Sequence, residues 1–291
     1  MSFQNILAVI DDTSTRSAVI KKSIILANKS QAHLTILNVE KNHTFNLKYL
    51  FHKKAVDIKP TNNLEFMREY PVKNNVIDMI ECQSHSIHAA VVNECEQHDY
   101  DLVVVSHKFY PPFFNEIMIS DESHLLSTPD IPIMFVDKNE WQANGHLLTA
   151  LEFEHTDEEH KELNLHLLNE SVNLANLLQN DVHLINCFLN NDIGMAFTPP
   201  PEKPHYNDNQ LKLATLAKQF RVERQQIHIE QGLVEDIIET MVNKLPANMV
   251  ILGNAPQHGI LRHLKGHTAE YLLNNIKTDV YVIKPLQQHL H

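Results

Sequence analysis

A loop that carries glycines, cations and a hydroxyl follows an apolar run near the end of the chain. The run Asn248–Leu252 leads into Gly253, and the loop continues as far as Thr268. Glycines let backbone N–H groups approach an anion, and a helix N-terminus adds unpaired donors and a favourable dipole. Arg262 and Lys265 add positive charge nearby. We therefore predict a ligand-binding loop, whose candidate residues are Gly253, Asn254, Gly259, Arg262, Gly266, His267 and Thr268.

The corresponding loop of the first half has a different composition. It contains no glycine, since the first glycine of the chain is Gly145, and residues 106–114 read SHKFYPPFF. Asp121 and Glu122 then open the next predicted helix, where they suit the helix dipole but would repel a phosphate. We predict that the first half binds no nucleotide. Its aromatic side chains either cover the crevice, the interpretation that we favour, or line an apolar pocket.

The chain contains 20 histidines, and two groups have spacings that could bind a metal. His155 and His160 flank the acidic run 157–159, and His263 and His267 are four residues apart. Neither pair comes with a fixed set of further ligands. We therefore interpret these residues as solvated surface histidines and predict no metal site.

Cysteines and catalytic patterns give no sign of an enzyme. Cys82, Cys95 and Cys187 are isolated, and Cys95 and Cys187 lie within apolar stretches, which is typical of small buried residues. No Ser-His-Asp order, Cys-His pair or phosphate-binding lysine loop is present in the sequence. We predict no catalytic residues.

The overall composition indicates an acidic protein with packed cores. Of the 291 residues, 43% are apolar and 21% charged, which favours folded domains over disorder. The formal net charge of -12 argues against nucleic acid and anionic membranes as partners. No apolar run approaches the roughly 18 residues of a membrane span, and no signal-like segment opens the chain. We expect a cytoplasmic protein.

Apolar runs alternate with amphipathic segments along both halves. Continuous apolar strands separated by helices predict a parallel sheet that is covered on both faces. The predicted strands are Asn5–Ile10, Ala32–Val39, Asp101–Val105 and Ile131–Val136, then His146–Leu151, Val182–Phe188, Gln226–Glu230, Asn248–Leu252 and Asp279–Ile283. The predicted helices are Thr15–Asn28, Ile87–Gln97, Glu162–Leu178 and Val234–Leu245.

The two halves repeat one pattern. Strand positions correspond at offsets of 141 (Ile6 and Leu147), 150 (Leu34 and Leu184) and 147 (Val103 and Val250, Pro132 and Asp279). Offsets this similar predict a duplicated domain, with residues 1–138 as domain 1, residues 146–291 as domain 2 and a polar linker between them. In such sheets a ligand lies beyond the carboxyl ends of the strands, where the strand order reverses.

The segment Ile251–Pro285 resembles the C-terminal part of universal stress proteins. In nucleotide-binding members this part reads glycine, two residues, glycine, nine residues, glycine, then serine or threonine. Gly253 and Gly266 match the first and third glycines, and the resemblance extends over both halves to tandem members of the family.

Three positions depart from the pattern of the nucleotide-binding members. Pro256 stands at the middle glycine and has no N–H to donate. His267 stands at the hydroxyl position, with Thr268 one residue later. Glu152 stands where many members have an aspartate that contacts the nucleotide in ATP-binding relatives, so it joins the candidate ligand-binding residues.

The resemblance implies a fold and a function. The fold is two tandem Rossmann-like domains (adenine nucleotide alpha-hydrolase-like), each a five-stranded parallel sheet with helices on both faces. The function is that of a non-enzymatic cytoplasmic stress-response protein that binds a ligand or a protein partner. The resemblance also implies that the last strands of the two halves pack together, and we expect the whole chain to form a homodimer.

Two alternatives remain open. In the first, domain 2 binds ATP or AMP and acts as a switch with weak or no hydrolysis. In the second, the chain carries a small apolar or lipid-like ligand, for which the aromatic loop after Ser106 and the prolines 199–201 are the motivation.

Overall fold

The chain forms two compact units. A computed structural model describes residues 3–11, 15–41, 77–107, 125–126, 131–153, 157–188, 204–254, 272–273 and 275–285. The first unit comprises Met1–Glu140 and Asp279–Val282, and the second comprises Trp141–Thr278 and Ile283–His291. Residues 279–282 therefore belong to the first unit, although they lie in the second half of the sequence.

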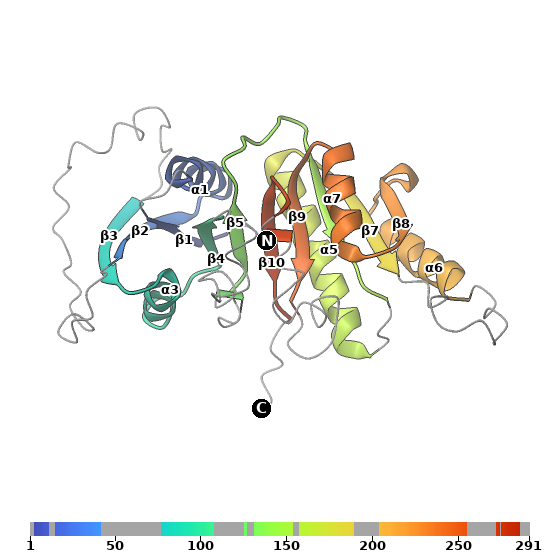
Figure 1. Cartoon of the computed structure of the whole chain (residues 1–291), viewed down its shortest axis with the longest axis horizontal. Coiled ribbons are helices and arrows are strands. Elements are labelled where there is room, and N and C mark those ends of the chain that lie inside the picture. Colours follow the sequence, from blue (N-terminus) through green and yellow to red (C-terminus); the bar gives the residue numbers. More distant parts are fainter. Residues whose placement is uncertain are drawn as a thin grey trace. The chain divides into compact units, whose positions relative to one another are not determined.

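The first unit contains a parallel sheet with helices on both faces (Figure 1). Its strands stand in the order β3-β2-β1-β4-β5. The central strand β1 is buried from Ile6 to Ile10, because helices cover both faces. The elements are β1 (Asn5–Ile10), α1 (Arg16–Ser30), β2 (His33–Lys41), β3 (Ile77–Ser84), α3 (Ile87–Cys95), β4 (Leu102–Ser106) and β5 (Ile133–Val136).

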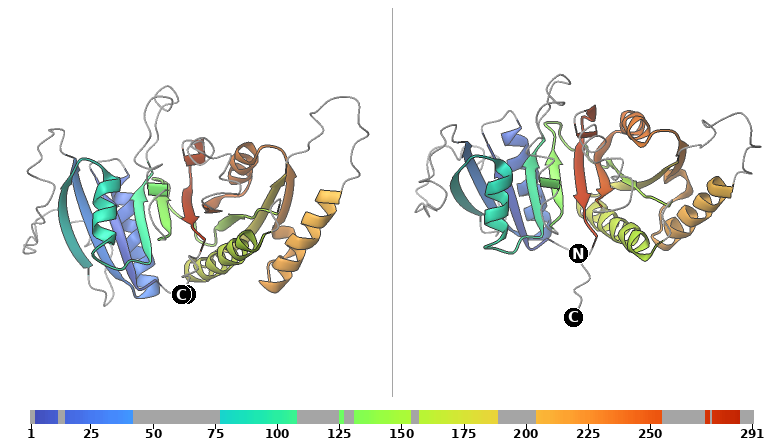
Figure 2. Two further views of the ribbon diagram at one scale, coloured as in Figure 1. Left: turned by 90° about the horizontal axis from the view of Figure 1, so that it is seen from below. Right: turned by 60° about the horizontal axis from the view of Figure 1, so that its bottom comes forward.

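The second unit has the same design. Its parallel strands stand in the order β9-β6-β7-β8. Helices α5 and α6 cover one face and α7 the other (Figure 2). The elements are β6 (His146–Ala150), α5 (Glu158–Leu178), β7 (Asp181–Phe188), α6 (Pro204–Gln219), a 3-10 turn η3 (Arg224–Gln226), β8 (Ile227–Gln231), α7 (Val234–Lys244) and β9 (Ala247–Gly253).

The first helices of the two units end in the same way. Gln31 and Gln179 both have a φ of 60°, and each donates its N–H to an alanine carbonyl, that of Ala27 or Ala175. Glycine usually occupies this left-handed position, because other residues pay a steric penalty there. Two glutamines at the same unusual position support the duplication that the strand offsets indicated.

The fold class predicted from the sequence is confirmed, and the structure adds two elements. Strand β3 was not predicted because it lies at a sheet edge, where all of its side chains are half-buried or exposed, so it lacks a continuous apolar run. Helix α6 was not predicted because Pro204 was assigned to a proline-rich loop. Proline is in fact favoured at the first position of a helix, and α6 starts there.

The strand β10 (Asp279–Ile283) pairs antiparallel with β5. Val280 lies opposite Phe135 and Val282 opposite Ile133. The expectation that the last strands of the two halves meet is thereby confirmed.

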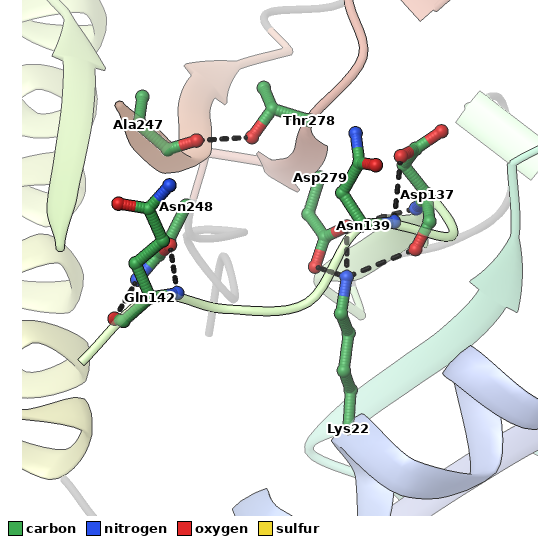
Figure 3. Close-up of polar contacts among 8 residues, drawn as sticks. All are labelled: Lys22, Asp137, Asn139, Gln142, Ala247, Asn248, Thr278 and Asp279. Carbon is green, nitrogen blue, oxygen red and sulfur yellow. Dashed lines mark hydrogen bonds and ion pairs between the residues drawn. The ribbon is translucent and has the colours of Figure 1, made fainter. Parts of the chain in front are cut away.

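A buried ion pair fixes the start of β10 in the first unit (Figure 3). Lys22 of α1 donates from Nζ to both carboxylate oxygens of Asp279, at 2.7 and 2.9 Å, and to the carbonyl oxygen of Asp137 at 3.0 Å. The backbone N–H of Asp137 donates to the same carboxylate at 2.8 Å. The side chains of Lys22 and Asp279 are only 4% and 1% exposed. The contacts therefore satisfy charges that would otherwise be buried at high cost.

Asn248 anchors the first residues of the second unit. Its Oδ1 accepts from the backbone N–H of Gln142 at 2.7 Å, and its Nδ2 donates to the carbonyl of Gln142 at 2.9 Å. Gly145 packs directly on the Asn248 amide, where any Cβ would collide with it. The hydroxyl of Thr278 donates to the carbonyl of Ala247 at 2.6 Å, so it ties the residue before β10 to β9 (Figure 3).

We expect Lys22→Met to lower the free energy of unfolding by about 3–5 kcal/mol, because the Asp279 carboxylate would stay buried without its cation. Urea denaturation at neutral pH measures this loss. Lys21→Met is the matched control. It removes the pair with Glu140, whose side chain is 75% exposed, and it should cost at most about 1 kcal/mol. Equal losses in the two variants would contradict the role assigned to the buried pair.

Candidate ligand-binding site

The strand order of the second unit reverses between β6 and β9. Strands β7 and β8 lie on one side of β6, and β9 lies on the other. The register pairs Thr149 with Ile251. The residues that follow, Glu152 after β6 and Gly253–Asn254 at the end of β9, therefore reach the same edge of the sheet. Such an edge is where parallel α/β sheets bind ligands.

Three of the predicted residues, Glu152, Gly253 and Asn254, are thus brought to one place. The remaining predicted residues fall outside the described part of the chain: Gly259, Arg262, Gly266, His267 and Thr268. The aromatic loop after Ser106, the helix start at 121–122 and the prolines 199–201 lie outside it as well.

Asparagine side chains hold the backbone that carries Glu152. Asn164 of α5 accepts from the backbone N–H of Glu152 at 3.2 Å and donates to its carbonyl at 2.6 Å. Asn186 of β7 donates to the carbonyl of Leu151 at 2.9 Å, and Asn209 of α6 donates to Asn186 at 3.2 Å. The Glu152 side chain, 12% exposed, is therefore mounted on a fixed backbone.

A histidine lies between Glu152 and a second carboxylate. The Nδ1 atom of His160 is 2.7 Å from a carboxylate oxygen of Asp157, and its Nε2 atom is 3.8 Å from Oε2 of Glu152. Asp157 also caps α5 by accepting from the backbone N–H of His160 at 3.1 Å. The hydrogen bonds from His160 lower the pKa of Asp157 to about 2. With a side chain that is 4% exposed, His160 is not a solvated surface residue, and that interpretation was wrong.

The sequence carried a signal for this arrangement. An aspartate three residues before a histidine, at the start of an amphipathic helix, is typical of an N-cap. The predicted helix began at Glu162, four residues late, so the cap was missed.

Gly253 has a packing role in the structure. A Cβ at this position would lie 2.9 Å from Cδ2 of Leu163 and 3.1 Å from Cδ1 of Leu167, both on α5. Glycine is therefore needed to let α5 approach the end of β9. This role accounts for Gly253 without a phosphate.

The first unit has equivalent positions at its own strand reversal, between β1 and β4. Asp11 follows β1 as Glu152 follows β6, and His107 follows β4 as Asn254 follows β9. The backbone N–H of His107 donates to the carbonyl of Val136 at 2.8 Å, and that of Asn254 to the carbonyl of Ile283 at 2.7 Å. The carboxyl edges of the two sheets are therefore built alike at their strand reversals.

His107 is a buried histidine at the carboxyl end of β4. It is 4% exposed, and within the described residues neither of its ring nitrogens makes a hydrogen bond. In the same described ranges the hydroxyl of its neighbour Ser106 has no hydrogen-bond partner either. Burial lowers the pKa of His107 to about 4, although the charge of Asp137 opposes the shift. The imidazole is therefore neutral near pH 7.

Two of the three cysteines, Cys95 and Cys187, have their thiols kept protonated by burial. Burial, with a smaller contribution from Glu94, raises the pKa of Cys95 to about 12. Burial also raises the pKa of Cys187 to about 12, with Glu230 contributing. Both thiols are therefore protonated and unreactive at neutral pH.

Within the described residues, no group of three or more histidine, cysteine or acidic side chains is arranged to hold a metal ion. The same ranges contain no helix that is long and apolar enough to cross a membrane.

Known proteins are similar to this chain over most of its length. The universal stress protein family matches residues 155–284. "Universal stress protein E homolog" of Haemophilus influenzae is 24% identical over 304 residues, which cover 98% of each chain. "Universal stress protein E" of Escherichia coli is 26% identical over 300 residues, or 98% of this chain and 95% of that protein.

Solved structures share the fold. A universal stress protein from Archaeoglobus fulgidus has a TM-score of 0.68 at 14% identity, covering 98% of this chain and 97% of that one. A Pseudomonas aeruginosa protein assigned to the universal stress proteins has a TM-score of 0.74 at 21% identity, with coverages of 98% and 94%. These structures share the Rossmann-like α/β fold of the two units. The chain is similar to universal stress proteins over almost its whole length, so the resemblance to tandem members of that family is confirmed.

We expect Gly253→Ala to destabilise the second unit by about 1–3 kcal/mol in the absence of any ligand, because the new methyl group collides with two leucines. Thermal or urea unfolding measures the loss. Leu163→Val removes the nearest colliding methyl group, so the double variant should lose less than the sum of the single variants. Additive losses would count against the packing role.

We expect His107→Asn to flatten the acid dependence of the first unit's stability. Unfolded histidine has a pKa near 6.5, whereas folded His107 titrates near 4, so the unfolded state binds the extra proton between these values. Stability is therefore lost as the pH falls through this window. Between pH 7 and pH 5 the variant should lose about 2 kcal/mol less than the unmodified protein.

Urea unfolding at the two pH values measures this difference. Asparagine is the residue at the equivalent position of the second unit, Asn254, so the fold should accept it. His85→Asn, which removes an exposed imidazole, is the control. An unchanged pH dependence in His107→Asn would contradict the assignment.

Proposed function

We propose that the chain is a non-enzymatic, cytoplasmic stress-response protein that acts by binding, with a ligand site in the second unit. The observation that carries this proposal is the fixed, largely buried Glu152 carboxylate at the strand reversal. Asn164 holds its backbone on both sides, and His160 faces its side chain. A carboxylate held in this way can accept hydrogen bonds from a ligand without rearranging.

The chemistry around Glu152 favours a ligand that donates hydrogen bonds. Glu152 and Asp157 give this edge negative charge, which His160 offsets only when it is protonated. Hydroxyl or amino groups, such as those of a nucleoside, suit such a surface better than a bare phosphate does. Gly253 adds little support for a phosphate, because its lack of a side chain is explained by Leu163 and Leu167.

The proposed ligand-binding residues remain those of the sequence prediction. They are Glu152, Gly253, Asn254, Gly259, Arg262, Gly266, His267 and Thr268. In this proposal Glu152 and Asn254 contact the polar body of the ligand, and the predicted residues between Gly259 and Thr268 supply the remaining contacts. A homodimer with a further protein partner completes the proposal.

The second candidate is an ATP- or AMP-binding switch in the same unit. Glu152 favours it, because it stands at the strand end where ATP-binding relatives place their nucleotide-contacting acid. Arg262 and Lys265 would then compensate the phosphates.

Calorimetric titration with adenosine, AMP and magnesium ATP tests both candidates. We expect Glu152→Ala to weaken binding of the recognised compound at least about 10-fold, because one charge-assisted hydrogen bond is lost. Glu158→Ala, at an exposed position on α5, should bind as the unmodified protein does. A phosphate-release assay on the same samples should show no turnover.

The outcomes separate the hypotheses. Tighter binding of ATP than of adenosine would favour the switch. Phosphate release that Glu152→Ala abolishes would overturn the non-enzymatic proposal. No heat with any of the three compounds, together with a bare mass in native mass spectrometry, would overturn the ligand site. An apolar adduct in that spectrum would instead support a carrier.

A further inference from the structure

Three histidines form a row across the second unit's sheet. They are His146 on β6, His183 on β7 and His228 on β8. His183 is in register with Leu148, and His228 with Ile185, so all three side chains leave the same face of the sheet. They lie near the amino ends of their strands, whereas the candidate ligand site lies at the carboxyl ends.

The row lies on the face that α7 covers. Thr149 hydrogen-bonds to Ser171 of α5 at 2.7 Å, which assigns the opposite face of β6 to α5. Asn186 contacts Asn209 of α6 on that same opposite face. The histidine row therefore lies on the face of the sheet that α7 covers. His183 is only 7% exposed, whereas His146 and His228 are half-buried.

His183 and His228 share one hydrogen bond. Nδ1 of His183 is 3.0 Å from Nε2 of His228. The ring centroids are 5.3 Å apart and the planes differ by 7°, as expected for two rings joined edge to edge. A neutral imidazole has one N–H and one acceptor nitrogen, so one ring donates and the other accepts.

Protonation of both rings is incompatible with this bond. If both rings are protonated, two N–H groups point at one another and two positive charges come together. His146 adds a third imidazole, edge-on to His183, with centroids 4.8 Å apart and an interplanar angle of 82°. Protonation of this ring would add to the repulsion.

The surroundings keep the pair neutral at pH 7. Burial lowers the pKa of His183 to about 4, with His146 and His228 adding to the effect and Asp181 opposing it. Burial also lowers the pKa of His228, with Glu230 opposing and Lys244 adding to the shift. The other charged residues of the elements nearby are Glu235, Asp236 and Glu239 on α7 and Arg224 on η3.

We propose that the His183–His228 pair is an acid-sensing element of the second unit. Near neutral pH the shared proton joins β7 to the edge strand β8. When both rings are protonated, the bond breaks and repulsion loosens β8 and the covering helix α7. This role is independent of the candidate ligand site, which lies at the other end of the strands.

The sign of the pH dependence follows from the two states. The folded pair resists protonation, whereas unfolded histidines take up protons near pH 6.5. Stability is therefore full above about pH 7 and is lost as the pH falls below 6.5 toward the lowered pKa values of the folded pair, which for His183 is about 4.

The first test uses the unmodified protein. An NMR titration of the imidazole nitrogens from pH 7.5 to 4 should find His183 and His228 neutral, as one donor and one acceptor, at pH 6. Uptake of a second proton should coincide with faster amide exchange in β7 and β8. Full protonation of both rings at pH 6 with unchanged exchange would overturn the proposal.

The second test removes the titration and keeps a hydrogen bond. Asparagine mimics Nδ1 and glutamine mimics Nε2, so His183→Asn with His228→Gln can form an amide pair in the same place. As the pH falls from 5.5 to 4.5, the unfolding equilibrium constant should rise more steeply in the unmodified protein than in the double variant, by up to about 100-fold per pH unit. The reason is that unfolding of the double variant takes up two fewer protons. Fluorescence of Trp141, the single tryptophan of the chain, follows the second unit.

His166→Gln, which removes a half-buried imidazole of α5, is the matched control and should keep the steep acid dependence. The buried His107 is present in every variant, so its contribution cancels. A double variant that is as acid-sensitive as the unmodified protein would contradict the proposal. So would a pH dependence of unfolding that is reduced equally in His166→Gln.

Discussion

The buried pair between Lys22 and Asp279 is the contact on which the organisation of this chain depends. It joins a helix near the start of the sequence to a strand near its end, and both side chains are withdrawn from water. Two backbone groups of Asp137 complete the arrangement. A bond of this kind is selective, because a neutral residue opposite Lys22 would leave a buried charge unmatched.

The pair has a consequence for how the chain is divided. Asp279–Val282 belongs to the first unit, whereas Thr278 and Ile283 on either side belong to the second. The chain thus enters the first unit for four residues and returns. Neither unit can be completed by a continuous half of the sequence, even though the sequence repeats at nearly constant offsets. Thr278 and Asn254 tie both ends of the excursion to β9.

The sequence predicted the repeating features well and the particular contacts poorly. Buried strands such as β4 and β9 reveal themselves because both of their faces need apolar side chains. β3 does not, since an edge strand is half exposed and its composition resembles that of a loop. Placing Glu152, Gly253 and Asn254 at one edge required only the strand order, which the family resemblance implied.

What the sequence could not supply was the content of individual contacts. The packing role of Gly253 depends on how closely α5 approaches β9, and spacing does not encode that distance. His160 was treated as a surface residue because histidine is tolerated in both settings, and only the three-dimensional contact with Glu152 distinguishes them. The role of Asp279 as partner of Lys22 depends on residues 257 positions apart.

The response of this acidic chain to acid depends on where its histidines are buried. With its histidines neutral the chain carries a formal charge of -12, and protonation of 12 of its 20 histidines would cancel that charge. Histidine in an unfolded chain takes up its proton near pH 6.5. His107 and His183 resist protonation until the pH approaches 4, because burial penalises their charged forms.

Charging of these buried imidazoles opposes the compact state, because the unfolded chain binds their protons at a higher pH. The duplicated fold therefore carries a buried acid-labile group in each unit, at different places in the repeat. His107 lies at the carboxyl edge of the first sheet, and His183 lies near the amino edge of the second. The two copies have thus diverged in where the labile group is buried, while the strand frame around it has stayed the same.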